Sequence, residues 1–116
     1  MSRRPWLSSL EEVEALQVEK GRLFYSATHE EIQKGYTTDV YFVTAQEILR
    51  HLKRADTVVT AEVFPRRPGV LCGVSEVLNL LSGSNVEIWG LEEGEEFAAR
   101  EVIMRIRGPY SEFGIF

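Results

Sequence analysis

The segment from Asp39 to Phe64 changes its hydrophobic period once, from the spacing of a helix to that of a strand. Asp39 is a suitable N-cap, and the apolar residues that follow it lie on one face of a helix reaching Leu52: Val40, Val43, Ile48, Leu49 and Leu52. Thr57 to Phe64 is rich in β-branched residues and stops at Pro65, as strands do. A chain with both elements needs a helix layer and a sheet, so we expect an α+β domain.

Similar signals predict the remaining elements. Residues 9–20 form a helix that stops at Gly21, and Thr28 with Glu31 forms a capping box that opens a short helix closed at Gly35. A further helix covers 74–81, and strands cover 86–89 and 102–106, with Gly108-Pro109 terminating the last strand. We expect a single domain over 1–116, with a small mixed or antiparallel sheet and helices packed on one face.

Composition and charge exclude several classes of protein. Eighteen acidic and thirteen basic residues among 116 give a formal net charge of -5, which argues against a nucleic-acid partner. No apolar run approaches the ~20 residues that span a bilayer, and the start lacks the apolar segment of a signal peptide. The single cysteine, Cys72, cannot form an intramolecular disulfide. We therefore expect a cytoplasmic protein that binds neither nucleic acid nor membrane.

Reactive and metal-binding side chains are scattered along the chain. His29 and His51 lie on different predicted helices, so no metal site and no catalytic residue is predicted. Cys72 precedes a predicted helix, where its thiol could become a nucleophile, but a small buried hydrophobe is the better interpretation. The four glutamates around Gly94 are interpreted as a solvated hairpin turn: Glu92, Glu93, Glu95 and Glu96.

The run from Thr37 to Thr44 places a carboxylate, a phenol and several hydroxyls at the start of one helix. With Asp39 as N-cap, Tyr41 falls in the first turn, near the helix entrance. Two interpretations remain open. Tyr41 is either half-buried packing in a capped helix or, together with Asp39, part of a binding site.

The same residues resemble a known family. Thr38-Asp39-Val40-Tyr41, preceded by Glu30-Glu31-Ile32-x-x-Gly35, resembles the amino-terminal segment of nicotinate phosphoribosyltransferase. About sixty residues later, the strand Glu101 to Ile106 with Gly108-Pro109-Tyr110 and Glu112-Phe113-Gly114 is similar to that family's exit from its first domain. The resemblance covers about Phe24 to Phe116, and two motifs in the right order are more specific than either alone.

The resemblance implies a function in pyridine nucleotide salvage and NAD biosynthesis. Members of the family are glycosyltransferases that join nicotinate to phosphoribosyl pyrophosphate, commonly with the ATP hydrolysis typical of a ligase. The complete enzyme would use ATP and Mg, whereas no cofactor is expected in this chain. On the family pattern, Tyr41 stacks on the pyridine ring, with Asp39 beside it, in a nicotinate site shared with a partner subunit. The expected assembly is a homodimer or a complex with a barrel-domain partner.

Two departures from the family pattern limit what the chain could do alone. Arg107 stands where an acidic residue is expected in the family, and we expect this chain to lack the α/β barrel that carries the phosphoribosyl pyrophosphate site. The isolated chain is therefore expected to be inactive. The preferred base stays open among nicotinate, nicotinamide and quinolinate.

Other readings of the chain also stay open. It could be a non-catalytic binding or regulatory interaction domain. A biotinyl- or lipoyl-type carrier hairpin is a weaker alternative, because Met104 is followed by Arg105 rather than by lysine. The apolar end, with Phe113, Ile115 and Phe116, is either a tail docked on its own core or an exposed element cut from a longer polypeptide. We expect exposure, with self-association or partner binding.

Overall fold

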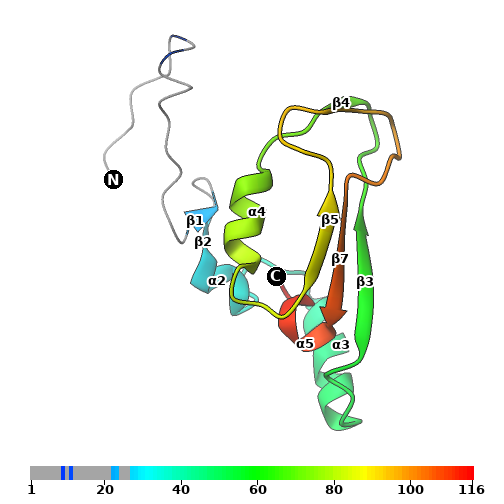
Figure 1. The fold of residues 1–116 in the computed structure, drawn as a ribbon. Coiled ribbons are helices and arrows are strands. Elements are labelled where there is room, and N and C mark those ends of the chain that lie inside the picture. Colours follow the sequence, from blue (N-terminus) through cyan, green and yellow to red (C-terminus); the bar gives the residue numbers. More distant parts are fainter. Residues whose placement is uncertain (1–8, 10, 12–21, 24–26) are drawn as a thin grey trace.

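The computed structural model describes residues 9, 11, 22–23 and 27–116, so the helix predicted at 9–20 lies outside the described residues except at positions 9 and 11. The helices are α2 (His29–Gln33), α3 (Val40–His51), α4 (Val74–Leu81) and α5 (Tyr110–Phe113). The strands are β1 (Arg22–Leu23), β2 (Ala27–Thr28), β3 (Val58–Val63), β4 (Gly69–Val70), β5 (Glu87–Gly90), β6 (Glu96–Phe97) and β7 (Met104–Pro109) (Figure 1). The α+β class is confirmed.

The central sheet has the order β3-β7-β5, and both of its strand pairs are antiparallel. Ile106 in β7 lies opposite Ala61 on one side and Ile88 on the other. Two short pairs, β1 with β2 and β4 with β6, are also antiparallel. We expected a mixed or an antiparallel sheet, and all strand pairs in the described part of the chain are antiparallel.

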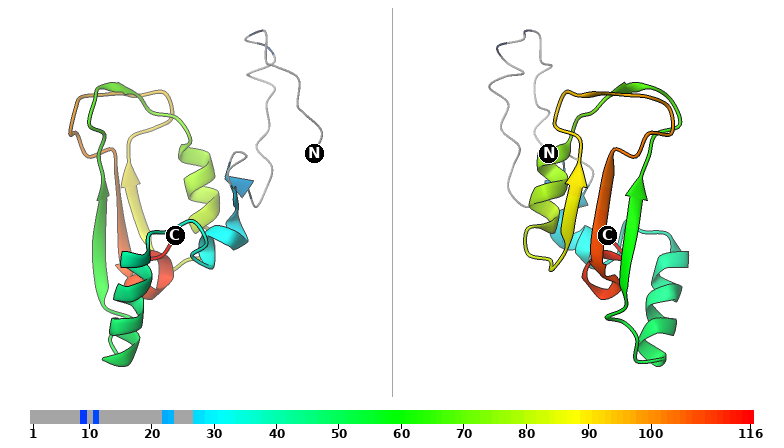
Figure 2. Two further views of the ribbon diagram at one scale, coloured as in Figure 1. Left: turned by 180° about the vertical axis from the view of Figure 1, so that it is seen from behind. Right: turned by 45° about the vertical axis from the view of Figure 1, so that its right-hand side comes forward.

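The two faces of the central sheet differ in chemistry because side chains alternate along each strand. On one face, Val59, Ala61 and Ile106 point toward the helices, and the strands lie in front of these helices in the right-hand view of Figure 2. On the other face, Arg105 Nε lies 2.9 Å from Glu62 Oε1, and Arg107 Nη1 lies 3.7 Å from Glu87 Oε2. The expected packing of helices on one face is confirmed.

Local capping explains where α2 begins and ends. Thr28 Oγ1 accepts a hydrogen bond from the Glu31 amide at 3.2 Å, and the Glu31 carboxylate accepts one from the Thr28 amide at 3.0 Å. This is the predicted capping box, which satisfies two amides that a helix start would otherwise leave free. After α2 the chain turns through Gly35, whose φ of 80° is costly for other residues.

The last strand differs from its prediction. It covers Met104–Pro109 instead of 102–106, so it begins two residues later than predicted and ends at Pro109, within the Gly108-Pro109 pair that was predicted to terminate it. All six residues of β7 pair with β3, from Met104 opposite Val63 to Pro109 opposite Val58. Gly108 lets the chain near Asn85 pack closely against β7, because a Cβ at position 108 would lie 2.8 Å from the Asn85 carbonyl oxygen.

The carboxy-terminal apolar residues are covered by the rest of the domain. Phe113 is only 8% exposed, and Ile115 and Phe116 are half-buried. Phe116 packs against a core cluster formed by Ala27, Ile32 and Leu80. The expectation that these residues lack a covering layer is wrong, and the alternative of a tail docked on its own core is correct.

Candidate functional site

Tyr41 lies in the first turn of α3 and is 71% exposed. Asp39 is the N-cap, and its Oδ1 accepts a hydrogen bond from the Tyr41 amide at 2.8 Å. The cap predicted for Asp39 is therefore confirmed. The interpretation of Tyr41 as half-buried packing is wrong, because the first turn directs its ring away from the core. A flat, exposed aromatic face next to a carboxylate can bind a planar polar ring.

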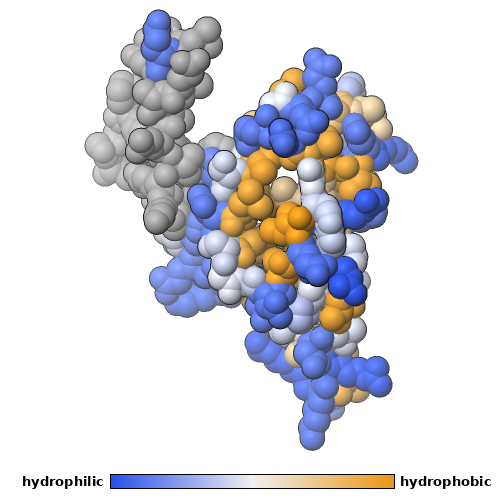
Figure 3. All heavy atoms as spheres, viewed as in Figure 1, coloured by the Kyte–Doolittle hydropathy of each residue, from blue (hydrophilic) through white to orange (hydrophobic). Residues whose placement is uncertain are grey.

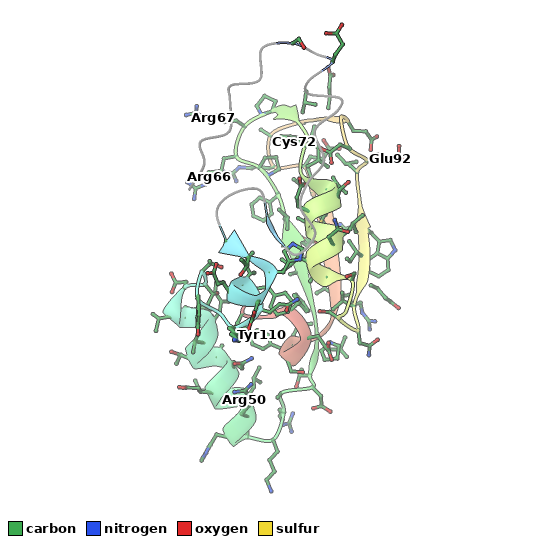
Figure 4. The ribbon with its side chains drawn as sticks, turned by 90° about the vertical axis from the view of Figure 1, so that its left-hand side faces the viewer. Arg50, Arg66, Arg67, Cys72, Glu92 and Tyr110 are labelled. Carbon is green, nitrogen blue, oxygen red and sulfur yellow. The ribbon has the colours of Figure 1, made fainter. Side chains whose placement is uncertain are left out.

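Two other aromatic residues, Phe42 and Tyr110, lie close to Tyr41 in the structure. The rings of Tyr41 and Phe42 meet edge to face, with centroids 5.3 Å apart. The Tyr110 hydroxyl donates a hydrogen bond to the Phe42 carbonyl oxygen at 2.8 Å, and Figure 4 shows Tyr110 where α3 and α5 come together. Burial raises the pKa of the Tyr110 phenol, and the Tyr41 phenol raises it further. Tyr110 is therefore a neutral donor at physiological pH.

An apolar cavity of about 340 Å³ lies behind Phe42, between the central sheet and the helices. Helix α4 contributes Val77, Leu80 and Leu81 to its wall, and α5 contributes Tyr110 and Phe113. The first turn of α3 therefore has two sides. Phe42 faces the cavity, whereas its neighbour Tyr41 faces solvent.

Apolar exposure continues along α3 from Tyr41. Ile48 and Leu52 follow it at intervals of seven and four residues, a spacing that keeps all three on one side of a helix. Ile48 is 54% exposed and Leu52 is 59% exposed. Exposed apolar residues in such a row are typical of surfaces that contact another protein.

The other sequence candidates gather at the opposite end of the domain, where Figure 4 places Cys72 and Glu92. Cys72 is exposed, so its interpretation as a small buried hydrophobe is wrong. Leu71 is the buried neighbour, and side chains that alternate along an extended segment place Cys72 outward.

Glu93 has a role that the sequence did not indicate. Its carboxylate accepts hydrogen bonds from the amides of Gly73 at 2.7 Å and Val74 at 2.8 Å, at the start of α4. This carboxylate occupies the amides that could otherwise stabilise an anion there. The segment around Gly94 is a turn, but β5 and β6 on its two sides do not pair with each other, so the hairpin expectation is wrong.

An apolar groove lies between α4 and β5, where apolar side chains gather in Figure 3. Its walls include Val74, Leu78 and Ile88, with Glu92 and Glu93 at its rim. The carrier alternative places the attachment position, beside Met104, near a hairpin. Met104 is instead 7% exposed in β7, the middle strand of the central sheet, so that alternative fails.

The described part of the chain has neither a cluster of metal ligands nor a membrane-spanning helix. His29 and His51 lie on α2 and α3, and no group of three or more histidine, cysteine or carboxylate side chains there could hold a metal ion. No helix within the same residues is long and apolar enough to cross a bilayer.

Comparison with known proteins identifies the class to which this fold and site belong. Residues 39–116 match the sequence model of the quinolinate phosphoribosyl transferase N-terminal domain, and this region begins at Asp39 and includes both Tyr41 and Tyr110. The chain belongs to this family of phosphoribosyltransferases of NAD biosynthesis, as the resemblance of its two motifs implied.

Two solved structures are similar to the chain. The crystal structure of nicotinate-nucleotide pyrophosphorylase from Pyrococcus furiosus is 40% identical over 81% of this chain, with a TM-score of 0.66. The chain covers only 25% of that protein. The structure of the nicotinate-nucleotide pyrophosphorylase from Francisella tularensis is 16% identical over 86% of this chain and 35% of that chain, with a TM-score of 0.45.

Proposed function

We propose that this domain recognises the pyridine base in a nicotinate phosphoribosyltransferase. The complete enzyme transfers the phosphoribosyl group of phosphoribosyl pyrophosphate to nicotinate, and yields nicotinate mononucleotide and pyrophosphate. The observation that carries the proposal is Tyr41, an aromatic residue 71% exposed at a capped helix start within the region that matches the family.

In this proposal the ring of Tyr41 stacks on the nicotinate ring. Stacking suits a flat aromatic ligand and contributes about 0.5–1.5 kcal/mol beyond the burial of area. Asp39 keeps the first turn of α3 in place through its bond to the Tyr41 amide, and its exposed carboxylate orients polar groups nearby. Recognition of the base thus depends on a side chain that its own domain leaves uncovered.

The reaction also needs groups that the described residues do not supply. In this proposal a barrel domain holds the phosphoribosyl pyrophosphate site, with Mg²⁺ and ATP. We place that barrel in a partner subunit, with this domain packed against it in a homodimer. The row of Tyr41, Ile48 and Leu52 supports this arrangement, because it gives α3 an apolar surface beside the proposed stacking residue.

The test is a product assay with the complete enzyme, comprising this domain and its barrel. Phosphoribosyl pyrophosphate is supplied with nicotinate, quinolinate or nicotinamide in separate reactions, and the mononucleotide is quantified. We expect nicotinate to give the highest kcat/KM. A preference for quinolinate, the base in the family's name, would contradict the proposed substrate, and transfer to no pyridine base would contradict the proposed function.

A further inference from the structure

Helix α3 makes little buried contact with the rest of the domain. Gln46 is the one buried residue among the twelve of α3, all of which the structure describes. A helix that buries so little depends on specific contacts to hold its position, since most helical stability comes from packing. The contacts that locate α3 therefore decide where Tyr41 lies.

Tyr110 contacts the first turn of α3 and the end of the segment that leads from α3 into β3. Its hydroxyl donates to the Phe42 carbonyl oxygen in the first turn, at 2.8 Å. In a helix this carbonyl already faces the amide four residues later, and its second lone pair is free for an outside donor. The Tyr110 amide donates to the carbonyl oxygen of Thr57, in the loop that follows α3, at 2.9 Å. One residue thus connects the first turn of α3 to the segment beyond its last turn.

Gly114 provides the space that the Tyr110 ring needs. A Cβ atom at position 114 would lie 2.5 Å from ring atoms Cε1 and Cζ of Tyr110, closer than side chains tolerate. Its φ of -59° is ordinary, so the requirement for glycine here concerns space and not backbone conformation. Tyr110 and Gly114 are four residues apart, and together they fix the direction of the phenol.

The residue after Gly114 contacts the entrance to α3. A Cβ at Gly35 would lie 3.2 Å from Ile115 Cδ1 and 3.6 Å from Thr38 Cγ2, so Ile115 packs directly against this turn. The segment from Tyr110 to Ile115 therefore supports α3 at the turn before it and at the Phe42 carbonyl in its first turn. The two sequence motifs, distant along the chain, form a single structural unit.

From this geometry we infer that Tyr110 is a positioning residue for base binding, which acts by fixing the first turn of α3 and with it the ring of Tyr41. The inference rests on the proposed function of Tyr41. Tyr110 itself does not touch the base. Its hydroxyl donates a hydrogen bond to the Phe42 carbonyl oxygen, which restrains the first turn of α3. The edge-to-face contact between Phe42 and Tyr41 then restrains the Tyr41 ring.

The test uses Tyr110→Phe in the complete enzyme, with Tyr36→Phe as a matched control. Tyr36 is 74% exposed beside the same turn, and its hydroxyl has no hydrogen-bond partner among the described residues. Because Tyr110 acts through the Tyr41 ring, we expect Tyr110→Phe to raise KM for the base by no more than about two- to tenfold, the range of one stacking contact, with kcat changed less than twofold. Tyr36→Phe should leave both constants unchanged.

Two further measurements separate positioning from a general loss of stability. In a Tyr41→Ala background, Tyr110→Phe should no longer raise KM, because the ring that it positions is absent. Amide hydrogen exchange at residues 43–46 should accelerate severalfold in Tyr110→Phe, whereas exchange in β7 should stay unchanged. An equal rise in KM with and without Tyr41 would overturn the inference.

The outcomes also distinguish this inference from the proposed function. Unchanged KM in Tyr41→Ala contradicts base stacking, whatever the exchange rates show. Unchanged exchange at residues 43–46 in Tyr110→Phe contradicts the positioning role, whatever Tyr41→Ala does to KM.

Discussion

Tyr110 joins a polar contact to a partly buried ring, and this combination makes its contribution to stability depend on pH. Burial and the Tyr41 phenol raise the pKa of Tyr110 above its ordinary value of 10. As pH rises, the phenol of Tyr110 therefore loses its proton at lower pH in the unfolded chain than in the folded one. The stabilisation that the neutral phenol contributes is fully present below about pH 10, and it is lost as pH rises through the folded-state pKa. The stability difference between the wild type and Tyr110→Phe should shrink above pH 10, as urea unfolding at pH 8 and 10.5 would show. A constant difference would contradict this assignment.

Glu93 is a second residue whose effect can be isolated. Glu93→Ala removes both hydrogen bonds to the α4 amides, so it should lower the free energy of unfolding by about 0.5–2 kcal/mol, as other N-cap losses do. Glu96→Ala removes the same charge from the exposed neighbouring strand and should change stability by less than about 0.5 kcal/mol. Both free energies of unfolding are measured by chemical denaturation. Equal effects of the two variants would show that the loss of a negative charge matters and that the Glu93 hydrogen bonds to the α4 amides do not.

Helix α5 contributes a buried aromatic side chain to the core of the domain. Phe113 is 8% exposed beneath the central sheet, so Phe113→Ala should cost about 3–5 kcal/mol, as large aromatic core truncations do. Equilibrium unfolding in urea tests this expectation. A loss below about 1 kcal/mol would mean that the tail is not docked in solution.

Elements were predictable from sequence where their signals are local. The Thr28 capping box and the Asp39 cap involve residues two or three positions apart, and α2 and α3 were predicted from them. β7 was misplaced because its limits follow from pairing with β3, which is distant in sequence. The exposure of Cys72 was also missed, because it follows from the alternation of side chains next to the buried Leu71 and not from composition.

The candidate site follows the same division. Asp39 and Tyr41 were singled out from one short run, and the structure places both at the exposed start of α3. Tyr110 was quoted only as part of a motif, because its bond to Phe42 joins residues 68 positions apart. Glu93 was hidden for the same reason, since its partners precede it by 19 and 20 positions. Contacts at such separations depend on the fold and leave no local pattern.

For the molecule as a whole, the proposed function makes this domain one part of a two-part active site. The 116-residue chain alone should show no phosphoribosyl transfer, because positioning and charge stabilisation of the pyrophosphate require groups beyond it. The complete enzyme, assayed in parallel, is the control. Formation of a mononucleotide by the purified 116-residue chain would contradict this division of roles.

The central claim is that Tyr41 belongs to the base site and not to the core, and the KM for nicotinate of Tyr41 variants in the complete enzyme tests it most directly. Tyr41→Ala should raise KM about two- to tenfold, the range of one stacking contact, with Tyr41→Phe milder because it keeps the aromatic face. At 71% exposure, Tyr41→Ala should change the free energy of unfolding by less than about 0.5 kcal/mol, and Tyr36→Ala should leave KM unchanged. A large fall in melting temperature with unchanged KM would show instead that Tyr41 only stabilises the fold.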